Sequence, residues 1–154
     1  MRKIPVLTAA LLACLALPAF SAGDPPAPAT IAPRNPDYES GRTAVQAQNW
    51  KAALDSFNRA LAREPNNADI HNYLGYSRRQ SGNLDLAFKH YNEALRLDPR
   101  HKGAHEYIGE AYLMINNVPK AEEHLAQLDK LCFFSCGEYR DLKKAIEQYK
   151  SAKR

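Results

Sequence analysis

A period of 34 residues is the feature that most constrains what this chain can fold into. Shifting the sequence by 34 aligns glycines, alanines, bulky apolar residues and prolines in turn: Gly41, Gly75 and Gly109; Ala53, Ala87 and Ala121; Phe57, Tyr91 and Leu125; Pro65 and Pro99. Small residues are needed where two helices approach closely, and a bulky residue one helical turn further on fills the space beside that contact. A repeat of this length and pattern is typical of stacked helix-turn-helix units.

The clearest copy is residues 68–101, which contains Leu74-Gly75, Ala87, Tyr91 and Asp98-Pro99. These residues and their spacing resemble the tetratricopeptide repeat family. The resemblance implies an all-α fold, a right-handed α-solenoid of three repeats at about 34–67, 68–101 and 102–135. It also implies a capping helix at 138–151, so that the repeat domain would span 37–152.

Residues that favour helix ends divide each repeat into two helices. In the clearest copy, Gly82-Asn83 is expected to end the first helix and cap the second, and Pro99 to end the second. The expected helices are 37–47, 50–62, 68–81, 84–96, 102–115 and 118–131. A seventh helix is expected at 138–150, because apolar residues recur on one face there. Ser135 and Glu138 have the spacing of a capping box at its start.

The N-terminal residues have the pattern of a signal peptide over 1–22. Arg2-Lys3 precede an apolar run from residue 6 to 17, and small residues follow it. This pattern predicts export, most simply to the periplasm, and no other apolar run is long enough to span a membrane. A lipoprotein is the alternative, because residues 11–14 resemble a lipobox ending at Cys14, although residues 15–20 stay apolar. A proline-rich stretch at 23–36 is expected to be a disordered linker, with order beginning at Asn35-Pro36.

The charge balance does not favour nucleic acid as a partner. The whole chain has a net charge of +4, and removing Arg2 and Lys3 from its 21 basic residues leaves 19 against 17 acidic ones. Such a balanced chain lacks the strongly basic surface that binds a phosphate backbone.

Motifs for catalysis and cofactor binding are absent from the sequence, which has no glycine-rich phosphate loop, nucleophile elbow or His-Glu-x-x-His. We therefore expect no enzyme activity and no cofactor. His101 and His105 have the one-turn spacing of two metal ligands. However, His71 and His105 occupy equivalent repeat positions, as do His90 and His124, so these histidines are expected to be structural and no metal site is predicted.

Cys132 and Cys136 remain when the signal peptide is removed, in a compartment that would be oxidising. A turn between them would bring them within disulfide distance, and the bond would hold the last helix to the third repeat. Cys136 would also lie at the start of a helix, where the thiol pKa falls. Thiol-redox or copper handling by this pair is therefore the alternative function.

The resemblance also implies a concave groove lined by the first helix of each repeat. The family's contact positions fall on these residues: Tyr38, Arg42, Gln46, Asn72, Tyr76, Arg79, Gln80, Glu106, Glu110, Leu113 and Met114. The lysine and asparagine clamp that some members use for a C-terminal carboxylate would occupy five positions that hold other residues here: Tyr38, Arg42, Tyr73, Gly103 and Tyr107.

The sequence therefore predicts a non-catalytic adaptor or scaffold that binds a peptide or protein segment in this groove. A third alternative is a scaffold that self-associates through the exposed apolar end of the first repeat, so a homo-oligomer is possible. The partner's identity does not follow from the sequence.

Overall fold

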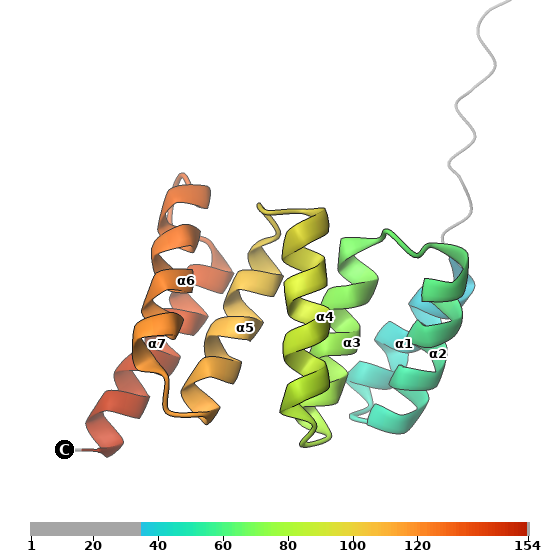
Figure 1. Ribbon diagram of the computed structural model, residues 1–154, viewed down its shortest axis with the longest axis horizontal. Coiled ribbons are helices and arrows are strands. Elements are labelled where there is room, and N and C mark those ends of the chain that lie inside the picture. Colours follow the sequence, from blue (N-terminus) through green and yellow to red (C-terminus); the bar gives the residue numbers. More distant parts are fainter. Residues whose placement is uncertain (1–34, 154) are drawn as a thin grey trace, which may run out of the picture. The chain divides into compact units, whose positions relative to one another are not determined.

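The computed structural model describes residues 35–153, which form seven helices and no strand. Figure 1 shows the helical pairs in chain order along the stack, with α1 and α2 at one end and α6 and α7 at the other. They are α1 (Pro36–Gln46), α2 (Trp50–Arg63), α3 (Ala68–Gln80), α4 (Leu84–Leu97), α5 (Lys102–Met114), α6 (Val118–Leu131) and α7 (Gly137–Ala152). This confirms the predicted all-α repeat fold. The expected signal peptide, Cys14 and the linker up to residue 34 lie outside the described residues.

The second helix of each repeat is capped by an asparagine, and these asparagines recur every 34 residues. The side chains of Asn49, Asn83 and Asn117 each accept a hydrogen bond from a backbone N–H in the first turn, at 3.1, 3.1 and 3.2 Å. The residue before each cap has a left-handed backbone conformation. In the second repeat this residue is Gly82, with a φ of 79°. Gln48 and Asn116 occupy the same position in the other repeats. The turn within each repeat is therefore built in the same way three times.

The chain starts its first helix as expected from Asn35-Pro36. The Asn35 side chain accepts a hydrogen bond from the Asp37 backbone N–H at 3.1 Å, and Pro36 is the first helical residue. The Asp37 carboxylate also pairs with Arg59 of α2 at 2.8 Å, which links the two helices of the first repeat.

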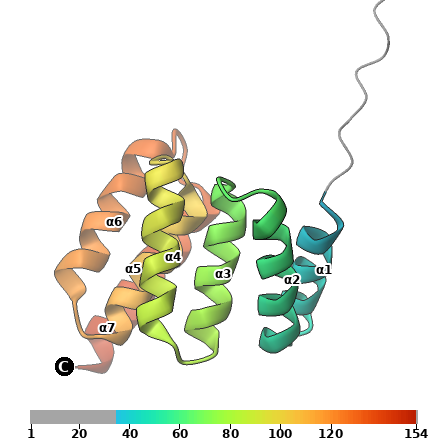
Figure 2. The same cartoon turned by 45° about the vertical axis from the view of Figure 1, so that its right-hand side comes forward.

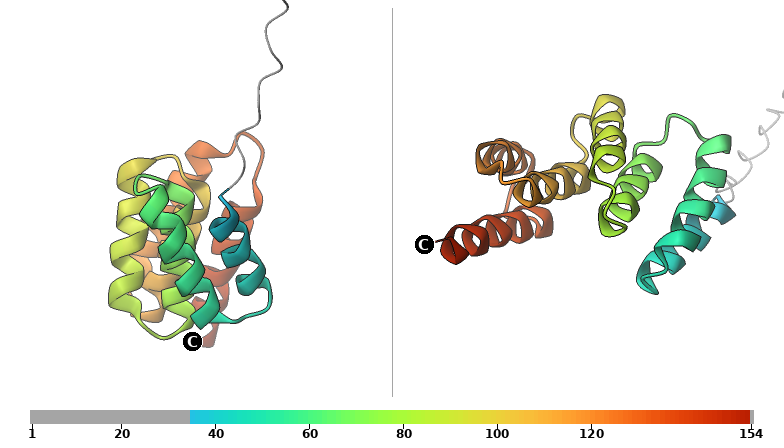
Figure 3. Two further views of the ribbon diagram at one scale, coloured as in Figure 1. Left: turned by 90° about the vertical axis from the view of Figure 1, so that its right-hand side faces the viewer. Right: turned by 60° about the horizontal axis from the view of Figure 1, so that its bottom comes forward.

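Each repeat is a helical hairpin, and its second helix also packs on the first helix of the next repeat. The first helices α1 and α3 contact each other, as do α3 and α5, whereas α2, α4 and α6 do not contact one another. In the views of Figures 2 and 3, α4 and α6 lie along the side of the stack opposite α3 and α7. We call the side of α1, α3 and α5 that lies away from α2, α4 and α6 the first-helix face.

The core consists of three apolar clusters, each joining a second helix to the first helix that follows it. The first contains Ala53, Phe57, Ala60, Ile70 and Leu74. The next contains Ala87, Tyr91, Ile108 and Ala111, and the last contains Leu113, Ala121, Leu128, Leu142 and Ile146. Leu74, Ile108 and Leu142 recur every 34 residues and play the same part in successive clusters. The helix α7 is therefore placed like the first helix of a further repeat, and it covers the apolar flank of the third.

The repeated glycines lie where a side chain would collide with a neighbour. A Cβ atom on Gly41 would lie 2.6 Å from the Phe57 ring. In the third repeat the three atoms nearest to a Cβ on Gly109 belong to Leu142 of α7, the first of them at 2.6 Å. Leu125, which aligns with Phe57 and Tyr91, packs against the last core cluster.

The start of α7 also differs from the expected capping box. Its N-cap is Cys136, and no side chain caps it. Because the helix begins one residue earlier than predicted, at Gly137, Ser135 lies just before the cap position. The Ser135 carbonyl oxygen instead accepts a hydrogen bond from the Arg140 guanidinium at 2.7 Å.

Candidate functional site

The residues predicted to line the groove all lie on the first helices, but they differ in how accessible they are. Arg79, Glu110 and Tyr76 form one cluster with Tyr107, and Asn72 and Glu106 are buried beside it. Gln46, Gln80 and Met114 are exposed near the C-terminal ends of their helices. Tyr38 packs edge-on against Phe57 in the first core cluster, and Arg42 pairs with Glu39 at 3.5 Å. Leu113 is a correction, because it is buried in the last core cluster.

The centre of the first-helix face is a group that we call the arginine–tyrosine cluster: Tyr76, Arg79, Tyr107 and Glu110. The Arg79 guanidinium carbon lies 5.4 Å from the centre of the Tyr76 ring and 5.6 Å from that of Tyr107. An Arg79 nitrogen is 2.7 Å from the Glu110 carboxylate, so the cluster joins α3 to α5. Only 10% of the Arg79 side chain is exposed, and an ion pair with so little access to water is weakly screened.

Aromatic rings extend this cluster towards the first repeat. The Tyr76 and Tyr107 ring centres are 4.9 Å apart, and Trp50, at the start of α2, lies edge-on to Tyr76 at 5.9 Å. Trp50 and Tyr107 were not among the predicted contact residues. Trp50 is the single tryptophan of the chain, and Tyr107 repeats Tyr73 at a spacing of 34, so both could have been found in the sequence.

Glu106 lies beside the arginine–tyrosine cluster without a partner of its own. Only 9% of this residue is exposed, and no hydrogen bond or ion pair reaches it within residues 35–153. Burial and then the charges of Glu110, Asp141 and Glu138 raise the pKa of Glu106 to about 8, while Arg79 acts in the opposite direction. The carboxyl of Glu106 is therefore largely protonated at neutral pH.

Four of the five histidines form two pairs, one within the second repeat and one within the third. The Nδ1 atoms of His71 and His90 are 3.2 Å apart, and those of His105 and His124 are 2.9 Å apart. The other ring nitrogens, His71 Nε2 and His105 Nε2, contact the carbonyl oxygens of Pro65 and Pro99 at 3.2 and 3.1 Å. Because a carbonyl can only accept, each of these Nε2 atoms donates, and His90 and His124 must donate to the vacant Nδ1 atoms. The pairs link the two helices of a repeat to the end of the repeat before it.

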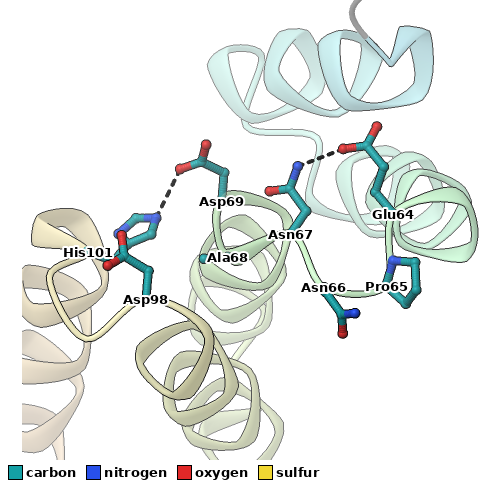
Figure 4. Close-up of a pocket in the computed structure, with 8 residues that line it drawn as sticks. All are labelled: Glu64, Pro65, Asn66, Asn67, Ala68, Asp69, Asp98 and His101. Carbon is teal, nitrogen blue, oxygen red and sulfur yellow. Dashed lines mark hydrogen bonds and ion pairs between the residues drawn. The ribbon is translucent and has the colours of Figure 1, made fainter.

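A pocket of about 500 Å³ lies away from the arginine–tyrosine cluster, at the turns that join the repeats. It is lined by Glu64, Pro65, Asn66, Asn67, Ala68, Asp69, Asp98 and His101. Figure 4 shows His101 pointing at Asp69 and Asn67 pointing at Glu64, at distances of 2.9 and 2.7 Å. His101 also caps α5 by accepting from the Ala104 N–H at 3.0 Å. These side-chain contacts, between His101 and Asp69 and between Asn67 and Glu64, hold the turns together.

Cys132 and Cys136 form a close pair across the turn between α6 and α7, with their Cα atoms 5.5 Å apart. Phe133 and Phe134 lie within this turn, 93% and 86% exposed, with their ring centres 4.8 Å apart. Among residues 35–153 the other exposed large apolar residues are Met114 and Ile115. None of these four is in the first repeat, for which the self-association alternative expected an exposed apolar end.

Residues 35–153 contain neither a candidate metal site nor a helix that could span a membrane. No group of three or more His, Cys, Asp and Glu residues there is placed to hold a metal ion. None of the described helices combines the length and the apolar character needed to cross a membrane.

Comparisons with known proteins agree with the repeat architecture. Family models described as tetratricopeptide repeat match residues 38–101 and 78–146. No curated protein sequence matches the chain.

Solved structures that are similar in fold include the following three. The first is the type III secretion translocator chaperone SycD of Yersinia enterocolitica, with a TM-score of 0.68 and 18% identity, covering 77% of this chain and 83% of that one. SycD in complex with a peptide of the translocator YopD has a TM-score of 0.65 and 19% identity, covering 77% and 93%. The TPR2B domain of yeast Sti1 in its pHsp70 complex has a TM-score of 0.69 and 16% identity, covering 77% and 96%.

Proposed function

The chain belongs to the tetratricopeptide repeat family, and we propose that it is a non-catalytic adaptor that binds a peptide or protein segment on its first-helix face. The arginine–tyrosine cluster is the observation that carries this proposal. Tyrosine, tryptophan and arginine are the residue types that contribute most to binding energy in protein interfaces. Here Tyr76, Arg79 and Tyr107 are held together by ring contacts and by the ion pair with Glu110.

The fixed geometry of the cluster favours binding. The Arg79 side chain is held on three sides, so little side-chain entropy remains to be lost when a ligand covers it. Two proteins of similar fold have been solved with a partner, SycD with a YopD peptide and the Sti1 domain with pHsp70. They support an interaction role for this chain and say nothing of its own partner.

We also propose that the protein is exported and that the Cys132–Cys136 bond is structural. The close pairing of Cys132 and Cys136 supports the bond, and within residues 35–153 the two cysteines belong to no group of three or more possible metal ligands. The bond ties the end of α6 to the start of α7, which covers the last apolar cluster. A covalent link at that place would stabilise the packing of α7 on the third repeat, and this role requires no redox or copper chemistry.

The proposal is tested by selecting binders from a displayed library of random twelve-residue peptides with the purified full chain. Tyr76→Ala should weaken the binding of the selected peptides about tenfold or more, because a hot-spot tyrosine contributes about 2 kcal/mol to the binding free energy. Tyr139→Ala is the matched control, since Tyr139 is a half-buried tyrosine on α7 outside the cluster. Circular dichroism shows whether both variants keep their helices. Unchanged binding by a folded Tyr76→Ala protein, with loss in Tyr139→Ala, would move the site to another face.

A further inference from the structure

Two buried polar groups on the first-helix face lack hydrogen-bond donors. Glu106 is 9% exposed and has no partner within residues 35–153. Asn72 is 5% exposed, and its Oδ1 atom is sealed from solvent and accepts no hydrogen bond from the described residues. A sealed acceptor without a donor, such as Asn72 Oδ1, is uncommon because it costs the free energy of its lost hydration, whereas the Glu106 oxygens are not sealed in this way.

The two groups belong to one place in the fold. A Cβ atom on Gly103 would lie 3.1 Å from Asn72 Nδ2, so the amide of Asn72 lies against the first turn of α5. Gly103, Glu106 and Glu110 are three and four residues apart, which puts them on one face of that helix. The absence of a side chain at Gly103 leaves room for the Asn72 amide beside Glu106. We call Asn72 and Glu106 the acceptor pair.

The charges around the acceptor pair are mostly negative. Glu110 of α5, and Glu138 and Asp141 of α7, all lie close enough to act on the Glu106 carboxyl. Arg79 is the cation that acts on it, but Arg79 already pairs with Glu110 at 2.7 Å and lies against two tyrosine rings. A further cation would therefore meet both unpaired acceptors and a negative field.

We propose that the acceptor pair receives a basic side chain, lysine or arginine, of the bound segment. This inference rests on the proposed function, because it names the chemistry that the first-helix face recognises. An N–H group of the incoming cation would donate to the Glu106 carboxylate, and hydrogen bonds to charged groups are the strong ones. Asn72 Oδ1 is sealed in the free protein, so it would accept a second N–H only after its side chain shifts. The ring of Tyr107, which lies beside Glu106 in the sequence and faces Arg79, would border the bound side chain.

The inference is tested on peptides selected with the full chain, as above. In the tightest peptide each arginine is replaced by citrulline, which has the same shape without the charge, and each lysine by norleucine. One such replacement should weaken binding to the wild type about tenfold, as expected for a buried charged pair. The same replacement should change the affinity for Glu106→Gln by less than about twofold. In that variant the carboxylate that pairs with the basic side chain has already been removed, so the two changes are coupled in a double-mutant cycle. Glu93→Gln on α4, which removes a carboxylate on a second helix, is the control and should behave as the wild type.

The pH dependence of binding gives an independent readout. The cation binds the ionised form of Glu106, whose pKa in the free protein is about 8. Binding to the wild type should therefore tighten roughly tenfold between pH 7 and pH 8.5, while Glu106→Gln should show no such change. Lysine and arginine keep their charge over this range, so they do not contribute to the slope.

The outcomes separate the two proposals. If no peptide is selected, the proposed function and this inference both fail. If peptides are selected but tolerate citrulline and norleucine at every position, or bind with no pH dependence, the inference fails and the proposed function stands. Should Glu106→Gln not fold, the replacement series and the pH profile on the wild type decide the matter alone.

Discussion

A Cβ atom placed on Gly75 would lie 2.6 Å from the ring of Tyr91. Tyr91 is completely buried and belongs to the apolar cluster that joins α4 to α5. The separation of α3 and α4 in the central repeat is thus set by a glycine on one helix and a tyrosine ring on the other. Because the ring is packed on all sides, it has no space into which to move.

We expect Gly75→Ala to lower the free energy of unfolding by about 1–3 kcal/mol, because the added methyl group overpacks this contact. Gly137→Ala is the matched control, since nothing lies within 4 Å of a Cβ atom there. That control should leave stability unchanged or raise it by up to about 1 kcal/mol, as alanine favours helix over glycine. Urea unfolding followed by circular dichroism measures both variants. Equal stability of Gly75→Ala and the wild type would contradict the close packing of α3 on α4.

The contact between Gly75 and Tyr91 was predictable because it is repeated. Each copy of the repeat meets the same neighbours, so residues that recur every 34 positions report a shared contact. The asparagine caps at Asn49, Asn83 and Asn117 follow the same logic. Gly109 shows where this reasoning stops: the atoms nearest to a Cβ there belong to Leu142 of α7, whereas at Gly75 they belong to Tyr91 of the same repeat.

The candidate site was predictable only in part. The helix face is predicted from the repeat register, and the structure brings Tyr76, Arg79 and Glu110 together. The ion pair between Arg79 and Glu110 joins two repeats, and it depends on how one hairpin sits on the next. The burial of Glu106 and Leu113 has the same origin. Spacing within a single helix does not contain this information.

The histidine pairs predict a loss of stability in weak acid. Burial, followed by the neighbouring His71 and Arg78, lowers the pKa of His90 from 6.5 to about 4, and burial beside His105 does the same for His124. The unfolded chain therefore binds more protons between pH 6.5 and pH 4, so these groups stabilise the fold fully above pH 6.5 and lose that effect as the pH falls towards 4.

Thermal unfolding at pH 4.5 and 6.5 tests this expectation. In His90→Asn with His124→Asn, the asparagine amide can still donate a hydrogen bond but does not titrate. The fall in melting temperature between the two pH values should be smaller in this double variant than in the wild type. An equally large fall in both proteins would show that other groups cause the acid sensitivity.

Glu106 should have the opposite effect on the pH dependence of stability. Its pKa in the folded protein is about 8, above the ordinary 4.5, so the folded state keeps a proton that the unfolded chain has released. The contribution of Glu106 to the free energy of unfolding is complete below pH 4.5 and is lost as the pH rises to 8. Between pH 6.5 and 8.5 the free energy of unfolding should fall in the wild type and stay nearly constant in Glu106→Gln. Parallel curves for the two proteins would contradict the protonated state of Glu106.

The disulfide should contribute modestly to stability. Closing a loop of about five residues is worth about 2 kcal/mol in the chain-entropy description, and Cys132→Ser with Cys136→Ser should lose about that much. Neither Cys132 nor Cys136 should be labelled by a thiol reagent until a reductant is added, as measured by mass spectrometry of the peptides. Partner binding should persist in the double variant, because the arginine–tyrosine cluster lies on α3 and α5. Labelling of both cysteines without reductant would instead favour the thiol-redox or copper function.

Phenylalanines at two places in the fold should respond very differently to substitution. Phe57 is completely buried in the first apolar cluster, and Phe57→Ala should cost about 3–5 kcal/mol, which is the range for a lost core phenylalanine. Phe133 and Phe134 are almost fully exposed, so Phe133→Ser with Phe134→Ser should stay within about 0.5 kcal/mol of the wild type. The serine variant should also elute earlier from a phenyl hydrophobic-interaction column, because it removes two of the four exposed large apolar residues in residues 35–153. If the serine variant instead lost more than about 1 kcal/mol, the rings would have to be packed against the protein in solution, and the exposed turn described here would be wrong.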